Sequence, residues 1–359
     1  MLRMSSQSPN RGIKIMKTTH GIVYAAVLGS LAGFSSAVSA ADLTVGAFGG
    51  IWEKSLRECA VAPFEAATGK TVEVVLGAPA QWMNQIAATP DKPPLDVIFM
   101  PTDNAYEVVN RGLADKFTLE TVPNMAELTP YYAEIGEGFG VAHNYGAMGI
   151  VYNKETVPEP PKSWEEFING TIEGKWRASI PSINYPGALS VNIWNMSQLN
   201  GGGVDNIEPG LAVIKKMQDS GNLDFWADPN QVLNGLQSGD IDVAMYWDGR
   251  AWAFIDDGHT EEFGYLNPTP GSVPAVTWIQ KVKNGSPLAW EFINMTLSAK
   301  VQGCFGSKMR YGVGNSKAEI DPAVAHEITP FDQLVFPPFK EITPKQSAWI
   351  ETWNKTIGR

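Results

Sequence analysis

Short apolar segments alternate with amphipathic segments from residue 43 onward, and this alternation restricts the chain to few architectures. The first part predicts strands and helices in turn, at residues 43–48, 52–67, 71–76, 81–88 and 95–100. Strands that alternate with helices are typical of a parallel sheet covered by helices. Ligands of such sheets bind beyond the carboxyl ends of the strands. We therefore expect Gly49-Gly50 and residues 101–104 to face one crevice.

The same alternation restarts near Ala147, which indicates a second structural unit. Ser163 and Glu166 have the S-x-x-E spacing of a capping box that opens a helix. The pattern further predicts strands at 148–152, 177–181, 241–246 and 276–282, and helices at 188–199, 209–220 and 232–238. We expect the chain to cross between units near Tyr145-Gly146 and again within 267–271. The predicted parts are a first lobe (41–146), a second lobe (147–267), and a return to the first lobe with C-terminal helices (268–359).

The first forty residues have the composition of a secretory signal peptide. A cationic segment precedes an apolar run at 21–34, and Val38-Ser39-Ala40 forms a small-x-small cleavage site. A bilayer-spanning helix needs about 20 apolar residues, which this run does not reach. We predict a signal peptide over residues 1–40 and an exported mature chain; a retained membrane anchor is the alternative.

Charge and cysteine content narrow the function classes. The chain has 27 Lys and Arg against 38 Asp and Glu, a net charge of -11, and the leader carries bases but no acid. An acidic mature protein disfavours nucleic acids and anionic membrane surfaces as partners. Cys59 and Cys304 are the two cysteines of the chain. In an oxidising compartment they are a candidate disulfide, and two buried free thiols are the alternative.

Five motifs occur in one order: residues 63–72 (PFEAATGKTV), 95–98 (LDVI), 149–154 (GIVYNK), 163–167 (SWEEF) and 239–249 (GDIDVAMYWDG). In these motifs the chain resembles the extracellular solute-binding proteins of ABC importers, and the last motif resembles the spermidine/putrescine-binding group. The resemblance implies an α/β, two-lobed periplasmic binding protein fold of type II. Each lobe would hold a parallel or mixed sheet flanked by helices, with a solute cleft between the lobes that closes by a hinge motion.

The resemblance also implies a set of ligand contacts and partners. An aromatic residue follows the first strand, polar residues follow the strand at 95–100, and further contacts come from the second lobe and from a tyrosine near the C-terminus. The corresponding residues are Phe48, Trp52, Thr102, Asn104, Asn184, Tyr185, Trp247, Asp248 and Tyr311. The implied partners are a small solute and an ABC permease in the inner membrane. The resemblance also implies a monomeric periplasmic protein that holds no cofactor.

Two of these residues have structural alternatives, and two places depart from the family pattern. Trp52 could pack within its helix, and Asp248 could cap the helix that follows it.

Polyamine binders of this family carry acidic residues at the positions that correspond to 182–187 and 274–275, where this chain has none. A buried polycation needs a carboxylate near each ammonium. The sequence therefore favours a small amine-bearing solute, such as an amino-acid-like zwitterion, held by Asp248 and one of Arg177, Arg250 and Arg310.

Other chemistries find less support in the sequence. The four histidines lie far apart without metal-ligand spacing, so we expect no metal site. Tyr131-Tyr132 resembles the tyrosine pair of ferric-ion binders, which is an alternative function. A secreted enzyme on the same two-lobed scaffold is another, because fold alone does not fix activity. No G-x-S-x-G motif or other nucleophile-base pair is visible in the sequence, and we predict that the protein is not an enzyme.

Overall fold

A computed structural model describes residues 41–185 and 187–358. The predicted signal peptide, residues 1–40, lies outside the described residues, which leaves its cleavage a prediction. Residues 41–359 form a compact unit by themselves. None of the helices in the described part of the chain has both the length and the apolar character needed to span a bilayer.

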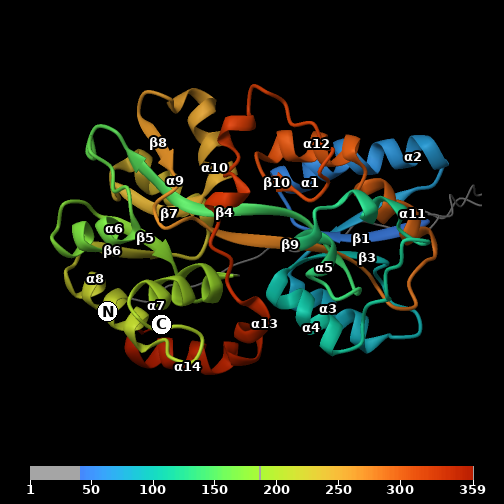
Figure 1. Ribbon diagram of the computed structural model, residues 1–359, viewed down its shortest axis with the longest axis horizontal. Helices are drawn as coiled ribbons and strands as arrows, with labels where there is room; N and C mark the ends of the chain where they lie inside the picture. The colour runs from blue at the N-terminus through green and yellow to red at the C-terminus, as the bar shows by residue number, and fades with distance from the viewer. Residues whose placement is uncertain (1–40, 186, 359) are drawn as a thin grey trace, which may run out of the picture. The chain divides into compact units, whose positions relative to one another are not determined.

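The strands of the described residues belong to one continuous sheet with the order β2-β1-β3-β9-β4-β7-β5-β6, and β8 and β10 pair with β4 (Figure 1). The strands are β1 (Leu43–Ala47), β2 (Val72–Leu76), β3 (Val97–Pro101), β4 (Val141–Asn153), β5 (Ala178–Pro181), β6 (Leu223–Trp226), β7 (Val243–Trp247), β8 (Phe263–Leu266), β9 (Val273–Lys281) and β10 (Gly312–Val313).

Helices cover both faces of this sheet. The α-helices are α1 (Ile51–Leu56), α2 (Ala62–Thr68), α3 (Pro79–Ala88), α4 (Thr102–Asn110), α5 (Pro130–Glu134), α6 (Trp164–Ile172), α7 (Asn195–Leu199), α8 (Glu208–Asp219), α9 (Pro229–Ser238), α10 (Asp248–Phe254), α11 (Leu288–Thr296), α12 (Ala299–Met309), α13 (Phe339–Ile342) and α14 (Gln346–Thr356). Shorter helical segments are η1 (Arg57–Val61), η2 (Pro123–Glu127), η3 (Leu189–Trp194), η4 (Ile255–His259), η5 (Ala325–Glu327), η6 (Phe331–Gln333) and η7 (Thr343–Lys345).

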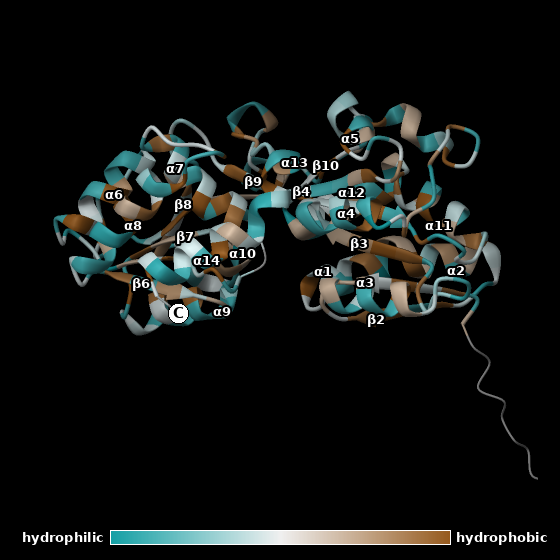
Figure 2. Ribbon diagram, turned by 90° about the horizontal axis from the view of Figure 1, so that it is seen from below, coloured by the Kyte–Doolittle hydropathy of each residue, from teal (hydrophilic) through white to brown (hydrophobic). Residues whose placement is uncertain are grey.

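The predicted α/β class with mixed sheets is confirmed. β1 pairs in parallel with β2 and β3, and β5 pairs in parallel with β6 and β7. β4 and β9 run antiparallel to their neighbours and make the sheet mixed. Residues 97–100 of β3 are fully buried, as a strand covered on both faces requires. In Figure 2, β3 is brown and teal gathers on peripheral helices such as α6, which matches helices that shield an apolar sheet.

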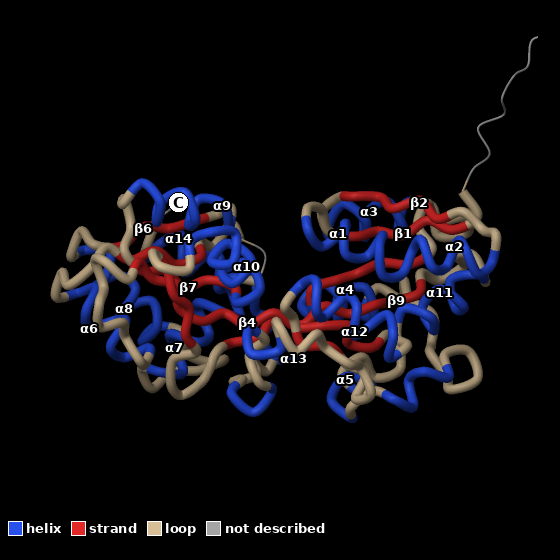
Figure 3. Tube along the Cα trace, turned by 90° about the horizontal axis from the view of Figure 1, so that it is seen from above, coloured by secondary structure: helices blue, strands red, loops and turns tan. Residues whose placement is uncertain are grey.

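Two hydrophobic cores share the sheet, and β4 and β9 cross between them (Figure 3). Along β4, Tyr145 belongs to the first core and Met148 to the second. Along β9, Val273 belongs to the second core and Val276 to the first. The first transition lies between Tyr145 and Met148, next to the crossing expected near Tyr145-Gly146. The second falls inside β9, just after the expected segment 267–271, because the proline- and glycine-rich residues lead into the crossing strand instead of forming it.

The C-terminal region contacts both cores. Phe339 packs in the first core, whereas Ile342, Trp349 and Trp353 pack in the second. Residues 268–359 therefore do not simply return to the first lobe, because the apolar face of α14 is buried on the second core. The lobe boundaries as a whole stay a prediction.

Local signals of the sequence agree with the structure at several places. Ser163 caps α6, where its Oγ accepts a hydrogen bond from the Glu166 backbone N–H at 3.1 Å. Cys59 in η1 and Cys304 in α12 form a disulfide with a Cα–Cα distance of 5.7 Å. The expected disulfide is thus present, and it ties the first helical segment to the helix that precedes Tyr311.

Candidate functional site

A cavity of about 360 Å³ lies where the two cores meet. Its lining comes from the carboxyl ends of β1, β3 and β7, the centres of β4 and β9, α10, the loop after β5 and the end of α12. The lining residues are Phe48, Gly49, Trp52, Gly77, Ala78, Pro79, Pro101, Asn144, Gly146, Tyr185, Gly187, Trp247, Arg250, Ala275, Val276, Thr277, Met309 and Tyr311. Strand ends from both parallel parts of the sheet thus meet at one site, as expected for α/β proteins.

A second hollow, of about 630 Å³, lies on the helices of the second core. Its lining includes Glu165, Asn169, Asn200 and Lys216 and holds no aromatic side chain. It is not at the carboxyl ends of strands, where α/β proteins bind their ligands. The cavity between the cores is therefore the stronger candidate.

Two glycines allow the cavity wall to close around Tyr311. A Cβ on Gly146 would lie 2.7 Å from the Tyr311 ring, and a Cβ on Gly249 would lie 2.2 Å from the carbonyl oxygen of Met309. Real Cβ atoms do not approach other atoms so closely. These positions need glycine because β4 and α10 pack directly against the end of α12.

Aromatic rings line the cavity from both sides. Trp52 stands edge-on to Phe48, with 5.3 Å between ring centroids, and also packs on Phe99 at 4.7 Å. On the other side, the Trp247 Nε1–H donates a hydrogen bond to the Tyr185 hydroxyl at 2.7 Å. Phe48, Trp52, Tyr185, Trp247 and Tyr311 therefore line one cavity, as expected. Trp52 packs in the first core and also lines the cavity, and its contact with solute stays a prediction.

Asp248 is placed differently from the sequence expectation. Its side chain is fully buried and is not among the residues that line the cavity. Asp248 Oδ1 accepts hydrogen bonds from the backbone N–H groups of Ala147 at 3.0 Å and Gly249 at 2.7 Å, and the Thr329 hydroxyl lies 2.9 Å from Oδ2. Burial raises the pKa of Asp248 to about 7, although the N–H groups of Ala147 and Gly249 act to lower it.

These contacts give Asp248 a structural role. It ties the start of α10 to β4 at the point where β4 crosses between the cores. The structure also corrects the alternative of a helix cap, because the N-cap of α10 is Trp247 and no side chain caps this helix. The spacing of residues along the chain does not reveal a contact with Thr329, which lies 81 positions away.

Three further expected contacts lie outside the cavity lining. The buried Thr102 hydroxyl donates to the Val276 carbonyl at 2.9 Å and accepts from Trp278 Nε1–H at 3.1 Å, so it joins the start of α4 to β9. Asn104 lies in α4, and Asn184 is exposed in the loop after β5. All three follow strand ends, yet none of them is among the residues that line the cavity.

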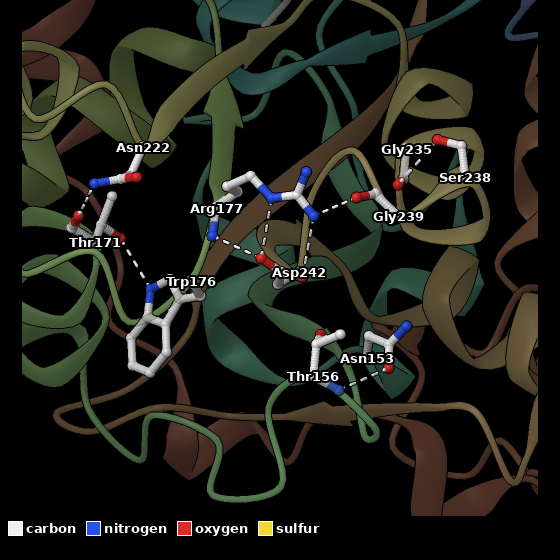
Figure 4. Close-up of polar contacts among 10 residues, drawn as sticks. All are labelled: Asn153, Thr156, Thr171, Trp176, Arg177, Asn222, Gly235, Ser238, Gly239 and Asp242. Carbon is white, nitrogen blue, oxygen red and sulfur yellow. Dashed lines mark hydrogen bonds and ion pairs between the residues drawn. The ribbon is translucent and has the colours of Figure 1, made fainter.

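Two of the three arginines named from the sequence are engaged elsewhere. Arg177 contacts Asp242 at 3.4 Å and the carbonyl of Gly239 (Figure 4). Arg310 pairs with Asp256 and Glu327. Arg250 lines the cavity and is the only charged residue among the described lining residues.

Sequence reasoning missed Asn144 and the 77–79 turn, which also line the cavity. Asn144 lies in the middle of a long strand and the turn precedes α3. Asn144 carries no local signal of function, because it reaches the cavity only through the pairing of distant strands. The turn directly follows the carboxyl end of β2, where α/β proteins bind their ligands, and this position is a signal that could have identified it.

Comparison with known proteins assigns the chain to a family. The model of the family described as bacterial extracellular solute-binding protein matches residues 59–327. The chain belongs to this family. No curated protein sequence matches this solute-binding protein.

Solved structures share the fold of this solute-binding protein. A protein described as an extracellular solute-binding protein from Bordetella parapertussis has a TM-score of 0.78 at 24% identity, covering 88% of this chain and 98% of that chain. An ABC transporter protein from Clostridium perfringens has a TM-score of 0.74 at 21% identity, with coverages of 88% and 99%. AgtB from Agrobacterium tumefaciens, in complex with agropinic acid, has a TM-score of 0.71 at 19% identity, with coverages of 89% and 99%. The two-lobed fold of periplasmic binding proteins is thereby shown.

Tyr131 and Tyr132 of this solute-binding protein pack among aromatic residues. Tyr131 contacts Phe336 with 4.5 Å between ring centroids, and Tyr132 contacts Phe331 at 6.3 Å. Neither tyrosine lines the cavity between the cores. Within residues 41–185 and 187–358, no group of three or more His, Cys, Asp and Glu side chains could hold a metal ion. The ferric-ion alternative therefore gains no geometric support.

Proposed function

We propose that this protein is the solute-binding component of an ABC importer, and that it captures a small amine-bearing zwitterion in the cavity between its cores. The observation that carries the proposal is the aromatic cavity of about 360 Å³, which draws its lining from both cores. A solute in this position contacts both lobes at once. Its binding therefore favours the closed arrangement of the lobes.

The lining suits a compact organic solute. Ligand pockets of about 300–1,000 Å³ are typical of small-molecule sites. An ammonium group can lie over the faces of aromatic rings such as Trp52 and Trp247. A polyamine fits less well, because the described lining offers no carboxylate to pair with a second ammonium. The related AgtB was solved with agropinic acid, which supports a small organic solute for this fold.

The cavity favours capture over catalysis. The described lining residues include no His, Cys, Ser, Asp or Glu, the side chains that most often serve as nucleophile or general base. Family membership supports solute capture in the periplasm and delivery to an inner-membrane permease. We further propose that the protein acts as a monomer that is released by cleavage after Ala40. A secreted enzyme on this scaffold is the competing proposal.

A thermal-shift panel on residues 41–359 tests the proposal. The panel contains amino acids, other zwitterions, polyamines, organic phosphates, and small carboxylates with their carboxamides. A compound present at 100 times its Kd raises the unfolding free energy by about 2.7 kcal/mol, so a true ligand is readily detected. NMR of the recovered compound is expected to show it chemically unchanged. Turnover of the compound, or no stabilisation by any zwitterion, would contradict the proposal.

A pair of tryptophan variants locates the binding site. Trp247→Ala removes an aromatic wall of the cavity and is expected to weaken calorimetric affinity at least about tenfold, or roughly 1.4 kcal/mol. Trp252→Ala is the matched control, because Trp252 lies in α10, the helix that begins directly after Trp247, but packs on Tyr265 and His326 outside the lining. Equal loss in both variants would indicate a general effect of α10 instead of a contact with solute.

A further inference from the structure

Arg250 differs from the other described arginines in its partners. Ion pairs join Arg57 to Glu53, Arg111 to Glu107, Arg177 to Asp242 and Arg310 to Asp256 and Glu327. Within the described residues, the Arg250 side chain forms neither an ion pair nor a hydrogen bond, although it is partly buried. A guanidinium withdrawn from water without a counter-charge is costly. We therefore expect a bound group of negative charge to offset the cost of burying this guanidinium.

The surroundings of Arg250 are otherwise neutral. No other charged side chain is present among the described lining residues, although the chain has a net charge of -11. Burial raises the pKa of Tyr185, Tyr246 and Tyr311, and the positive charge of Arg250 acts to lower each of them. The positive charge of Arg250 therefore acts on the pKa of all three hydroxyls. An acidic protein here carries an isolated positive charge inside an aromatic cavity.

A second polar group in the lining comes from the crossing strand. Asn144 in β4 is only 1% exposed, and its Oδ1 contacts His143 Nδ1 at 2.9 Å. The Asn144 amide Nδ2 makes no hydrogen bond within the described residues, and Asn144 lines the cavity. Arg250 and the Asn144 amide are both donors. A solute group that accepts hydrogen bonds and carries negative charge would satisfy both kinds of donor.

We infer that Arg250 binds a carboxylate of the solute, so that the substrate class is small organic carboxylates whose remaining atoms contact the aromatic walls. This inference rests on the proposed function for the location of the site. A guanidinium pairs with a planar carboxylate through two parallel N–H···O bonds. A carboxylate brings one negative charge to one cation. A phosphate monoester brings nearly two negative charges, and the described lining residues include no second cation to balance the additional charge.

Arginine variants test the role directly. Arg250→Gln removes the charge and is expected to weaken calorimetric affinity for the best carboxylate of the panel by about 10- to 150-fold. Arg250→Lys keeps the charge but loses the two-bond geometry, and an intermediate loss is expected. Arg57→Gln is the matched control, because Arg57 forms only an exposed pair with Glu53 on α1 and lies outside the lining. It is expected to bind as the unaltered protein does.

Chemical variation of the probe completes the test. The carboxamide of the best carboxylate should bind the unaltered protein about as weakly as the carboxylate binds the Arg250→Gln variant, and the variant should not discriminate between the two compounds. Near-ultraviolet circular dichroism and the melting temperature without solute establish that the variant is folded. If Arg250→Gln does not fold, the same pair of compounds is compared on the Arg250→Lys variant.

The outcomes separate the two proposals. A carboxamide that binds as tightly as its carboxylate, or an Arg250→Gln variant of undiminished affinity, overturns the carboxylate site and leaves the solute-binding proposal standing. An organic phosphate that binds more tightly than every carboxylate overturns the substrate class. If no compound of the panel binds at millimolar concentration, both proposals fail.

Discussion

Replacement of Asp248 by Asn is expected to keep the fold and to remove one source of pH dependence from its stability. The Thr329 hydroxyl lies 2.9 Å from Asp248 Oδ2 and 3.0 Å from Asn267 Oδ1. A hydroxyl has one hydrogen, so it cannot donate to both oxygens while Asp248 is ionised. A protonated Asp248 donates to Thr329, and Thr329 then donates to Asn267. An Asn side chain reproduces this arrangement, because its amide donates in the same direction.

The magnitude follows from the pKa of Asp248, which burial raises from 3.8 to about 7. Between these values the folded protein holds a proton that the unfolded chain has lost, so stability falls as pH rises through this window. Each pKa unit corresponds to about 1.4 kcal/mol, and the full effect is at most about 4 kcal/mol. The stability of the Asn variant minus that of the unaltered protein should thus grow from pH 4 to pH 7 and stay constant above.

Urea denaturation at intervals between pH 4 and pH 8 measures this difference. Asp242→Asn is the control, because the pKa of Asp242 is shifted in the opposite direction to that of Asp248. Burial acts to raise the pKa of Asp242, but hydrogen bonds from Arg177 lower it overall. Its carboxylate therefore stabilises the fold above pH 4, and the Asn variant should be less stable at neutral pH. Parallel stability curves for the unaltered protein and Asp248→Asn would refute the reasoning about the shared hydrogen.

Solute affinity distinguishes the structural role of Asp248 from direct contact with solute. We expect Asp248→Asn to change affinity by less than about threefold, since the side chain lies outside the cavity lining. A loss of tenfold or more at pH 8, with the fold intact, would restore the amine-pairing role that the sequence suggested.

Three further outcomes are expected. Replacing Cys59 and Cys304 together by Ser, which opens a loop with a sequence separation of 245 residues, should lower the unfolding free energy in urea by up to roughly 5 kcal/mol; a change below about 1 kcal/mol would contradict this. Thr102→Val should cost about 1–3 kcal/mol of stability without loss of solute affinity, because its buried hydroxyl joins the start of α4 to β9; weaker binding in calorimetry would argue for a ligand contact. Gly249→Ala should destabilise by about 1–3 kcal/mol, because its Cβ would lie 2.2 Å from a backbone carbonyl oxygen, whereas Gly203→Ala, with nothing within 4 Å, should be close to neutral in the same thermal melt.

Much of the fold could be predicted from local patterns. The buried run of β3, the cap at Ser163 and the restart of the alternation near Ala147 depend on residues within one or two turns of each other. The short strand β6 has no counterpart among the predicted elements, and α14 is predicted only in general terms, as one of the C-terminal helices without bounds. β6 spans only residues 223–226, and α14 is buried against a core built from residues far earlier in the chain.

The sequence by itself determined the α/β class, the pairing candidates Cys59 and Cys304, and the aromatic residues that face the cavity. Aromatic side chains at strand ends, such as Phe48 and Trp247, reach the cleft because the carboxyl end of a strand fixes its position in an α/β sheet. Only the tertiary structure decided the roles of the polar residues. Asp248 is buried because Ala147 and Thr329 close over it, and Arg250 has no ion-pair partner within residues 41–185 and 187–358 because none of their acids reaches it. A charged side chain takes its role from partners that are remote in sequence, and local patterns carry no record of them.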